Sequence, residues 1–177
     1  MDNNSVVNGS VYSNGNITGS GSITGSASAA NSAALAADQT NGSGTPYDVI
    51  FGNANGTQDF AQSFQVSTTT AVNKVELYLK KVSTPGNLTV RIVSNSGSNP
   101  STTTIASGSL SASLVSTTYG WVSVPFSSNP ELTAGATYWI VIDGATNATR
   151  YYLIGANNNG YTSGTGNIGQ YTSTWNN

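Results

Sequence analysis

Cysteine and histidine are both absent from this chain of 177 residues. Their absence excludes disulfide bonds, thiol nucleophiles, zinc sites built on sulfur or imidazole, and the side chain that most often transfers protons near neutral pH. Charge is also scarce, since 7% of the residues are charged against about 25% in average soluble domains. Hydroxyl and amide side chains must therefore supply the solubility, as is common in proteins that work outside cells.

Positive charge is too sparse for a nucleic-acid-binding surface. Five Lys and Arg residues stand against seven Asp and Glu residues, and the bases form no cluster beyond the pair Lys80-Lys81. Proteins that bind DNA or RNA carry a much denser basic surface. Apolar runs are also short, and none approaches the about 20 residues of a membrane-spanning helix. We therefore expect neither a nucleic-acid partner nor a membrane span.

The first residues, Met1-Asp2-Asn3-Asn4, contain neither the basic nor the apolar region of a signal peptide. One interpretation is that Met1 is an added start on a mature fragment, with an export signal outside this sequence. Together with the composition, this interpretation predicts an extracellular or cell-surface protein.

Residues 1–37 contain a six-residue spacing of apolar side chains. The repeated positions are Val11, Ile17, Ile23, Ala29 and Leu35. One aliphatic residue per six, with glycines between, is typical of a hexapeptide β-helix, although five repeats bury little without neighbours. A flexible Gly/Ser-rich linker remains the alternative. Residues 38–58 read as a connector, and we expect the apolar group at 47–51 within it to dock on the domain that follows.

Residues 59–177 read as consecutive strands separated by turns. The longest run of bulky β-formers is 138–143, where large side chains occupy both alternating sets, which predicts a central strand covered on both faces. Residues 94–104 read as a polar loop. Further strands are predicted at 60–66, 74–82, 88–92, 105–114, 121–126, 151–154 and 170–175. About eight strands without a long helix predict an all-β fold, a two-sheet jelly-roll sandwich.

Several short motifs follow one another in an order that resembles a known class of module. They are Ala61-Gln62-Ser63-Phe64, Leu77–Val82, Leu88–Ile92, Ser107–Leu110, Trp121–Val124 and Leu132–Asp143. Over residues 58–155 the chain resembles the choice-of-anchor jelly-roll modules of bacterial surface and secreted proteins, which are grouped with carbohydrate-binding modules. The resemblance implies an extracellular, non-catalytic module but transfers no binding residues. Residues 1–37 more weakly resemble bactofilin-like β-helices.

Catalytic patterns are missing among the acidic residues. The candidates are Asp48, Asp59, Glu76, Glu131 and Asp143. A glycosidase needs two carboxylates across one bond, one of them held protonated, whereas Asp143 opens a turn, Glu131 follows Asn129-Pro130 and Glu76 lies among lysines. The Ser-x-x-Lys motif is also absent. We therefore predict that the protein is not an enzyme.

Amphipathic aromatic residues are abundant, with nine Tyr and three Trp against four Phe. Sugar rings stack on such side chains while amides bind their hydroxyls, so we predict a glycan-binding site. Its candidate residues are Tyr119, Trp121, Tyr151, Tyr152, Asn157, Asn158, Asn159 and Tyr161. The alternative is that Trp121, Trp139 and one of Tyr151 and Tyr152 fill the core. We favour the core for both tryptophans and the binding role for Tyr161, which lies in a polar loop.

A structural calcium ion is a possible cofactor, because jelly-roll modules often bind hard cations through carboxylates and loop carbonyls. The candidate ligands are Asp48, Asp59 and Asp143, although no Asp-x-Asp-x-Asp loop is present. The sequence thus predicts an adhesive or glycan-binding module whose partner is a polysaccharide or surface glycan. The alternative is a structural subunit of a surface fibre, pilus or stalk that self-associates through residues 1–37.

Overall fold

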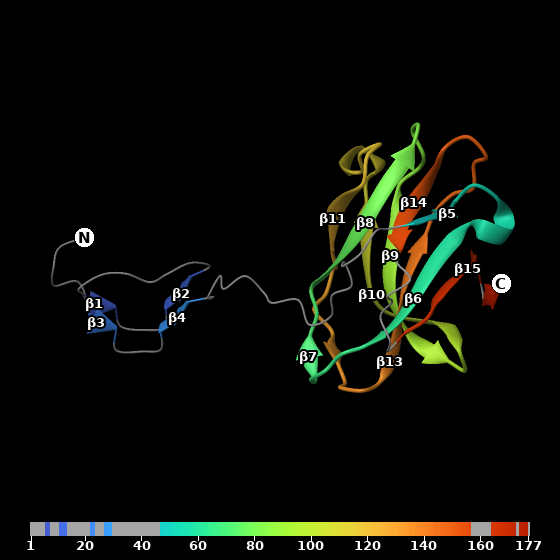
Figure 1. The fold of residues 1–177 in the computed structure, drawn as a ribbon. Coiled ribbons are helices and arrows are strands. Elements are labelled where there is room, and N and C mark those ends of the chain that lie inside the picture. The colour runs from blue at the N-terminus through green and yellow to red at the C-terminus, as the bar shows by residue number, and fades with distance from the viewer. Residues whose placement is uncertain are drawn as a thin grey trace. The chain divides into compact units, whose positions relative to one another are not determined.

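The structure of the protein is a computed structural model that describes residues 6–7, 11–13, 22–23, 27–29, 47–156, 164–172 and 174–176. The chain divides into two compact units, Met1–Ala37 and Asp38–Asn177, and Figure 1 shows the strands of each. Each unit is described by itself.

The first unit contains four short strands that pair in parallel. They are β1 (Val6–Val7), β2 (Val11–Ser13), β3 (Ser22–Ile23) and β4 (Ala27–Ala29). Val6 lies opposite Ser22 and Val11 lies opposite Ala27, so both ladders join residues sixteen positions apart. In a hexapeptide β-helix with three repeats in each turn, paired residues of successive turns would instead be eighteen positions apart. The stacking follows a sixteen-residue spacing, at which the dipeptide Gly-Ser also recurs, at 9–10 and 25–26.

The second unit is built from two main antiparallel sheets. Its elements are β5 (Tyr47–Phe51), η1 (Asn55–Thr57), β6 (Asp59–Gln65), β7 (Thr70–Ala71), β8 (Lys74–Val82), β9 (Leu88–Ser96), β10 (Asn99–Leu110), η2 (Ala112–Leu114), β11 (Gly120–Pro125), β12 (Glu131–Leu132), β13 (Thr137–Asp143), β14 (Tyr151–Ala156), β15 (Gly166–Tyr171) and β16 (Trp175–Asn176). The six-stranded sheet has the order β10-β9-β13-β6-β15-β16, the four-stranded sheet has the order β11-β8-β14-β5, and β7 pairs with β12. The all-β prediction is confirmed, and no helix among the described residues is long and apolar enough to cross a membrane.

Strand β13 lies in the middle of the six-stranded sheet, between β9 and β6. Its alternating side chains are buried on both faces, because Ile142 contacts the core between the two main sheets while Trp139 and Val141 belong to a separate apolar cluster. The prediction of a central strand covered on both faces is confirmed.

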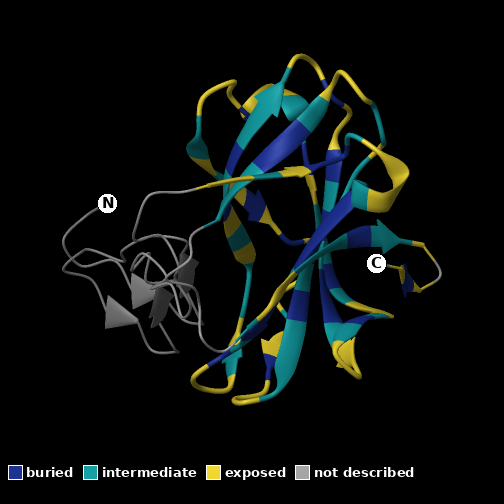
Figure 2. Ribbon diagram, turned by 45° about the vertical axis from the view of Figure 1, so that its right-hand side comes forward, coloured by how far each residue is buried: buried dark blue, intermediate teal, exposed yellow. Residues whose placement is uncertain are grey.

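The main core lies between the two sheets. The four-stranded sheet contributes Phe51 and Leu79, and the six-stranded sheet contributes Leu88, Val90 and Ile142, all 2% exposed or less. Figure 2 shows that buried positions lie along the strands of the two sheets and that most loops are exposed. Removal of this apolar surface from water is the main driving force for the packing of the two sheets.

The six-stranded sheet curls around a second, smaller core. Trp139 is 2% exposed and packs with Ala61, Val93, Val141 and Trp175 on the face that points away from the four-stranded sheet. Tyr171 in β15 donates a hydrogen bond from its hydroxyl to the carbonyl of Ser101 in β10, at 2.9 Å. This bond joins strands that are separated by β9, β13 and β6, so the sheet forms a half-barrel. Trp139 is therefore buried as predicted, but inside the curl rather than between the sheets.

Two predicted irregular regions contain strands. The predicted loop at 94–104 is a hairpin, because Gly97 takes a φ of 65° at the turn and Asn99 pairs with Ser96. The outer strand tolerates Pro100, since an edge position leaves one side of the ladder unpaired. The apolar group at 47–51 docks as expected, as the edge strand β5 paired with β14.

Candidate functional site

Three aromatic side chains gather on the outer face of the four-stranded sheet. Trp121 in β11 lies directly opposite Tyr78 in β8, and their rings are 5.2 Å apart at 44°. The ring of Tyr78 also stacks on Tyr119, with centroids 5.0 Å apart and planes 14° apart. Trp121 is 57% exposed. We call Tyr78, Tyr119 and Trp121 the aromatic cluster.

The alternation of β11 explains why Trp121 points outward. Successive side chains of a strand point to opposite faces of the sheet. Val122 and Val124 share one set and contact the main core, so Trp121 and Ser123 take the outer face. The preference for a core position of Trp121 was therefore wrong. Tyr78 is not among the predicted site residues, since its neighbour across the sheet depends on the pairing of β8 with β11.

An ion pair fixes one edge of the aromatic cluster. The ammonium of Lys80 lies 2.9 Å from a carboxylate oxygen of Asp48 and 4.4 Å from the ring centroid of Tyr119. The hydroxyl of Tyr119 donates a hydrogen bond to Asp48 at 2.8 Å. The hydrogen bond from Lys80, followed by that from Tyr119, lowers the pKa of Asp48. Burial, followed by the hydrogen bond to Asp48, raises the pKa of Tyr119, so near neutral pH the phenol stays protonated beside a charged carboxylate.

This arrangement offers the two kinds of contact that sugars use. The exposed indole of Trp121 presents an apolar surface on which the C–H groups of a pyranose ring can pack. Asp48 and Lys80 lie at the edge of the same cluster and can exchange hydrogen bonds with hydroxyl groups. An apolar surface bordered by a few polar groups is the usual composition of a small-molecule or sugar site.

Within the described part of the chain, the other predicted sugar-binding residues, Tyr151 and Tyr152, do not belong to the aromatic cluster. Tyr152 is 2% exposed, its ring stacks on Phe51 at 5.7 Å, and its hydroxyl donates to the carbonyl of Gly86 at 2.6 Å. Burial raises the pKa of Tyr152 to about 12. Tyr152 is thus a core residue that a ligand cannot reach, whereas Tyr151 is half-buried. Four candidates lie outside the described residues: Asn157, Asn158, Asn159 and Tyr161.

The three predicted calcium ligands do not form one site. Asp48 pairs with Lys80 and Asp143 with Arg91. Asp59 is fully buried and accepts backbone hydrogen bonds from Gly144 at 3.1 Å and Tyr171 at 2.6 Å. Burial raises the pKa of Asp59 to about 6. Among the described residues, no three acidic side chains come together as a metal site, so calcium binding stays a prediction without a ligand set.

Comparison of the chain with the families of known proteins, with curated proteins and with solved structures found no match. The aromatic cluster combines an exposed tryptophan, Trp121, with Tyr78 beside it, and Tyr78 in turn stacks on Tyr119 next to the ion pair of Asp48 and Lys80.

Proposed function

We propose that the protein is a non-catalytic glycan-binding module of the jelly-roll, choice-of-anchor type, secreted or displayed on a cell surface. The observation that carries this proposal is the aromatic cluster, in which Trp121 is 57% exposed on the outer face of a regular sheet. The glycan ring would stack on Trp121, while Asp48 and Lys80 would bind its hydroxyl groups.

Two properties of the cluster support a binding role. Single apolar residues are normal on protein surfaces, but here the exposed Trp121 continues into two half-buried tyrosines, and a contiguous aromatic surface more often marks an interaction site. The ladder of β8 and β11 also fixes the backbone at Tyr78 and Trp121, and ring contacts join Tyr78 to Trp121 and to Tyr119, which lowers the entropic cost of binding.

Replacement of Trp121 with alanine tests the proposed function. We expect the dissociation constant for the retained polysaccharide to rise about ten-fold to thirty-fold, because the main stacking surface is lost. Native affinity electrophoresis through gels that contain a panel of neutral and acidic polysaccharides measures this change. The matched control is Leu114→Ala, since Leu114 is also a large, exposed apolar residue, at 66%, but lies in η2.

Three outcomes are informative. Loss of retention in Trp121→Ala but not in Leu114→Ala supports the site, and recovery in Trp121→Phe would assign the effect to stacking. Equal retention of wild type and Trp121→Ala would remove the aromatic cluster as the site. Failure of the wild type to bind any polysaccharide of the panel would contradict the proposed function.

Assembly through residues 1–37 is a second candidate function. The two parallel ladders of the first unit, β1 with β3 and β2 with β4, stack successive segments of chain as a solenoid does. A stack of this kind leaves backbone hydrogen-bonding groups unpaired at its ends, where another copy can add. A fibre or stalk subunit of this design could also present the aromatic cluster.

Deletion of residues 1–37 is expected to convert an oligomer into a monomer, because the stacking surface is removed. Light scattering of both proteins at the same high concentration measures the mass. A full-length protein that is monomeric at that concentration would exclude assembly through this segment.

A further inference from the structure

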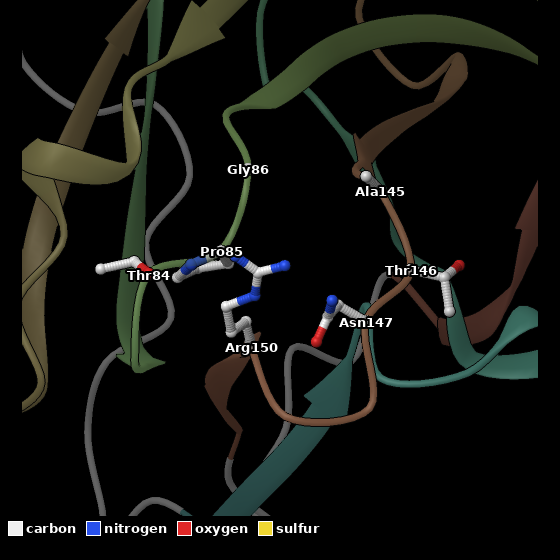
Figure 3. A pocket seen from close by; sticks show the side chains of 7 residues that line it. All are labelled: Thr84, Pro85, Gly86, Ala145, Thr146, Asn147 and Arg150. Atoms are coloured by element: carbon white, nitrogen blue, oxygen red, sulfur yellow. The ribbon is translucent and has the colours of Figure 1, made fainter.

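A cavity of about 390 Å³ lies between two loops of the second unit. The turn between β8 and β9 contributes Thr84, Pro85 and Gly86. The connection between β13 and β14 contributes the remaining lining residues, Ala145, Thr146, Asn147 and Arg150. Figure 3 shows the two loops facing each other across the cavity. Its volume falls in the range of small-molecule sites, about 300–1,000 Å³.

Hydrogen bonds from other elements fix the loop that carries Asn147 and Arg150. The side chain of Gln58 donates to the carbonyl of Gly144 at 2.9 Å and accepts from the hydroxyl of Thr146 at 3.2 Å. The backbone N–H of Asn147 donates to the carbonyl of Gly52 at 2.8 Å. These bonds hold this wall of the cavity in place, which lowers the entropic cost of binding.

Arg150 is exposed at the border of the cavity and differs from the other basic residues in its contacts. Lys74, Lys80 and Arg91 each form an ion pair, and Lys81 donates to the carbonyl of Ala112 at 2.6 Å. Among the described residues, the guanidinium of Arg150 has no such partner, and no lining residue of the cavity is acidic. A planar guanidinium without an ion-pair partner can donate two parallel hydrogen bonds to a carboxylate.

Asn147 adds a second donor. Its side-chain oxygen accepts hydrogen bonds from the backbone N–H and the hydroxyl of Thr149, both at 3.1 Å. These bonds fix the orientation of the amide, and Figure 3 shows its nitrogen on the side of the Arg150 guanidinium and its oxygen pointing away. The amide nitrogen of Asn147 and the guanidinium of Arg150 therefore border one cavity, and both can only donate hydrogen bonds. An anion, which accepts hydrogen bonds, is the ligand that suits such a pair.

The cavity and the aromatic cluster share strand β8. Tyr78 and Lys80 lie on β8, which ends at Val82, and Thr84 borders the cavity two residues later. Tyr151, which follows Arg150, pairs with Val82. At about 3.3 Å per residue, Tyr78 and Thr84 are separated by at most about 20 Å. An oligosaccharide of a few sugar units spans this distance.

We propose that the cavity between the β8–β9 turn and the β13–β14 loop binds the carboxylate of an acidic sugar through Arg150 and Asn147. This inference rests on the proposed function and specifies its ligand as a polysaccharide that contains uronic acid. Thr84 and Thr146 would border the ring of the same sugar, and the ring of Pro85 would contact its C–H face.

The test compares a polyuronate with its methyl-esterified, neutral form and with a sulfated neutral polysaccharide, all at low ionic strength. We expect the wild type to bind the polyuronate about ten-fold more tightly than the ester, because a charge-assisted hydrogen bond to a carboxylate is lost on esterification. Arg150→Gln is expected to abolish this preference and to leave binding of the neutral polymer intact. The matched control, Lys74→Gln, removes one positive charge elsewhere and should keep the preference.

The outcomes separate this inference from the proposed function. Both proposals are supported if Trp121→Ala no longer binds either polymer while Arg150→Gln loses only its preference for the polyuronate. An undiminished preference in Arg150→Gln, or equal binding of the sulfated polymer, would overturn the carboxylate site. If no polymer binds, NMR titration with free glucuronate tests the cavity by itself: a shift of the Arg150 Nε–H signal supports it, and an unchanged signal overturns it.

Discussion

Replacement of Trp139 with alanine is expected to lower the free energy of unfolding by about 3–5 kcal/mol. The indole is 2% exposed and fills the curl of the six-stranded sheet, where it packs with Ala61, Val93 and Trp175. Its Nε1–H donates to the side chain of Asn95 at 2.9 Å. The substitution would leave a large cavity and would remove the donor for Asn95. Urea denaturation followed by far-ultraviolet circular dichroism measures the change.

The matched control for Trp139→Ala is Trp121→Ala, which removes the same side chain from the outer face of the other main sheet. Because Trp121 is 57% exposed, we expect a loss of less than about 1 kcal/mol. Trp175→Ala, in the same cluster as Trp139, should also destabilise the protein. Similar losses in Trp139→Ala and Trp121→Ala would contradict the burial of Trp139 within a curled sheet.

Asp59 is expected to make the protein more stable at pH 4 than at pH 7. Its carboxyl is fully buried, and burial raises its pKa to about 6 from the ordinary 3.8. Between these values the folded state binds more protons than the unfolded state, so stability falls as pH rises through this window. At about 1.4 kcal/mol per pKa unit, the difference attributable to Asp59 approaches about 3 kcal/mol. Urea denaturation at a series of pH values measures it.

The variant Asp59→Asn isolates this effect from the other titrating groups. Asparagine keeps the size of the side chain and one acceptor oxygen but cannot titrate. The stability of wild type minus that of the variant should therefore decrease from pH 4 to pH 7. A constant difference across that range would show that Asp59 has an ordinary pKa in the folded protein. An increasing difference would mean that its hydrogen bonds from Gly144 and Tyr171 outweigh its burial.

The strands could be predicted where the sequence alternates strongly. Strand β8 has the predicted bounds, since Leu77 and Leu79 alternate with Glu76 and Tyr78. Strand β13 was recognised as central because both of its alternating sets are bulky. The curl of the six-stranded sheet could not be predicted, because it depends on contacts such as that of Tyr171 with Ser101, and local patterns do not specify long-range pairing.

The candidate site could be predicted only in part, for a related reason. Tyr119 and Trp121 were named as sugar-binding candidates, yet a core position was preferred for Trp121 because large aromatic residues are usually buried. The alternation of Trp121 with Val122 and Val124 instead predicts that the indole points outward. Tyr78 joins the cluster through strand pairing, and Arg150 and Asn147 border one cavity through the packing of two loops. Neither relation is visible in a linear sequence.

The curled sheet also has a consequence for the order of events during synthesis of the chain. Trp175 covers Trp139, and a glycine at 169 lets β16 cross close by, because a Cβ atom there would lie 2.2 Å from the carbonyl oxygen of Asn176. Residue 139 emerges from the ribosome before residue 175. The nascent domain therefore exposes one apolar face of β13 until β16 has also emerged, and we expect chaperone binding to concentrate in that interval.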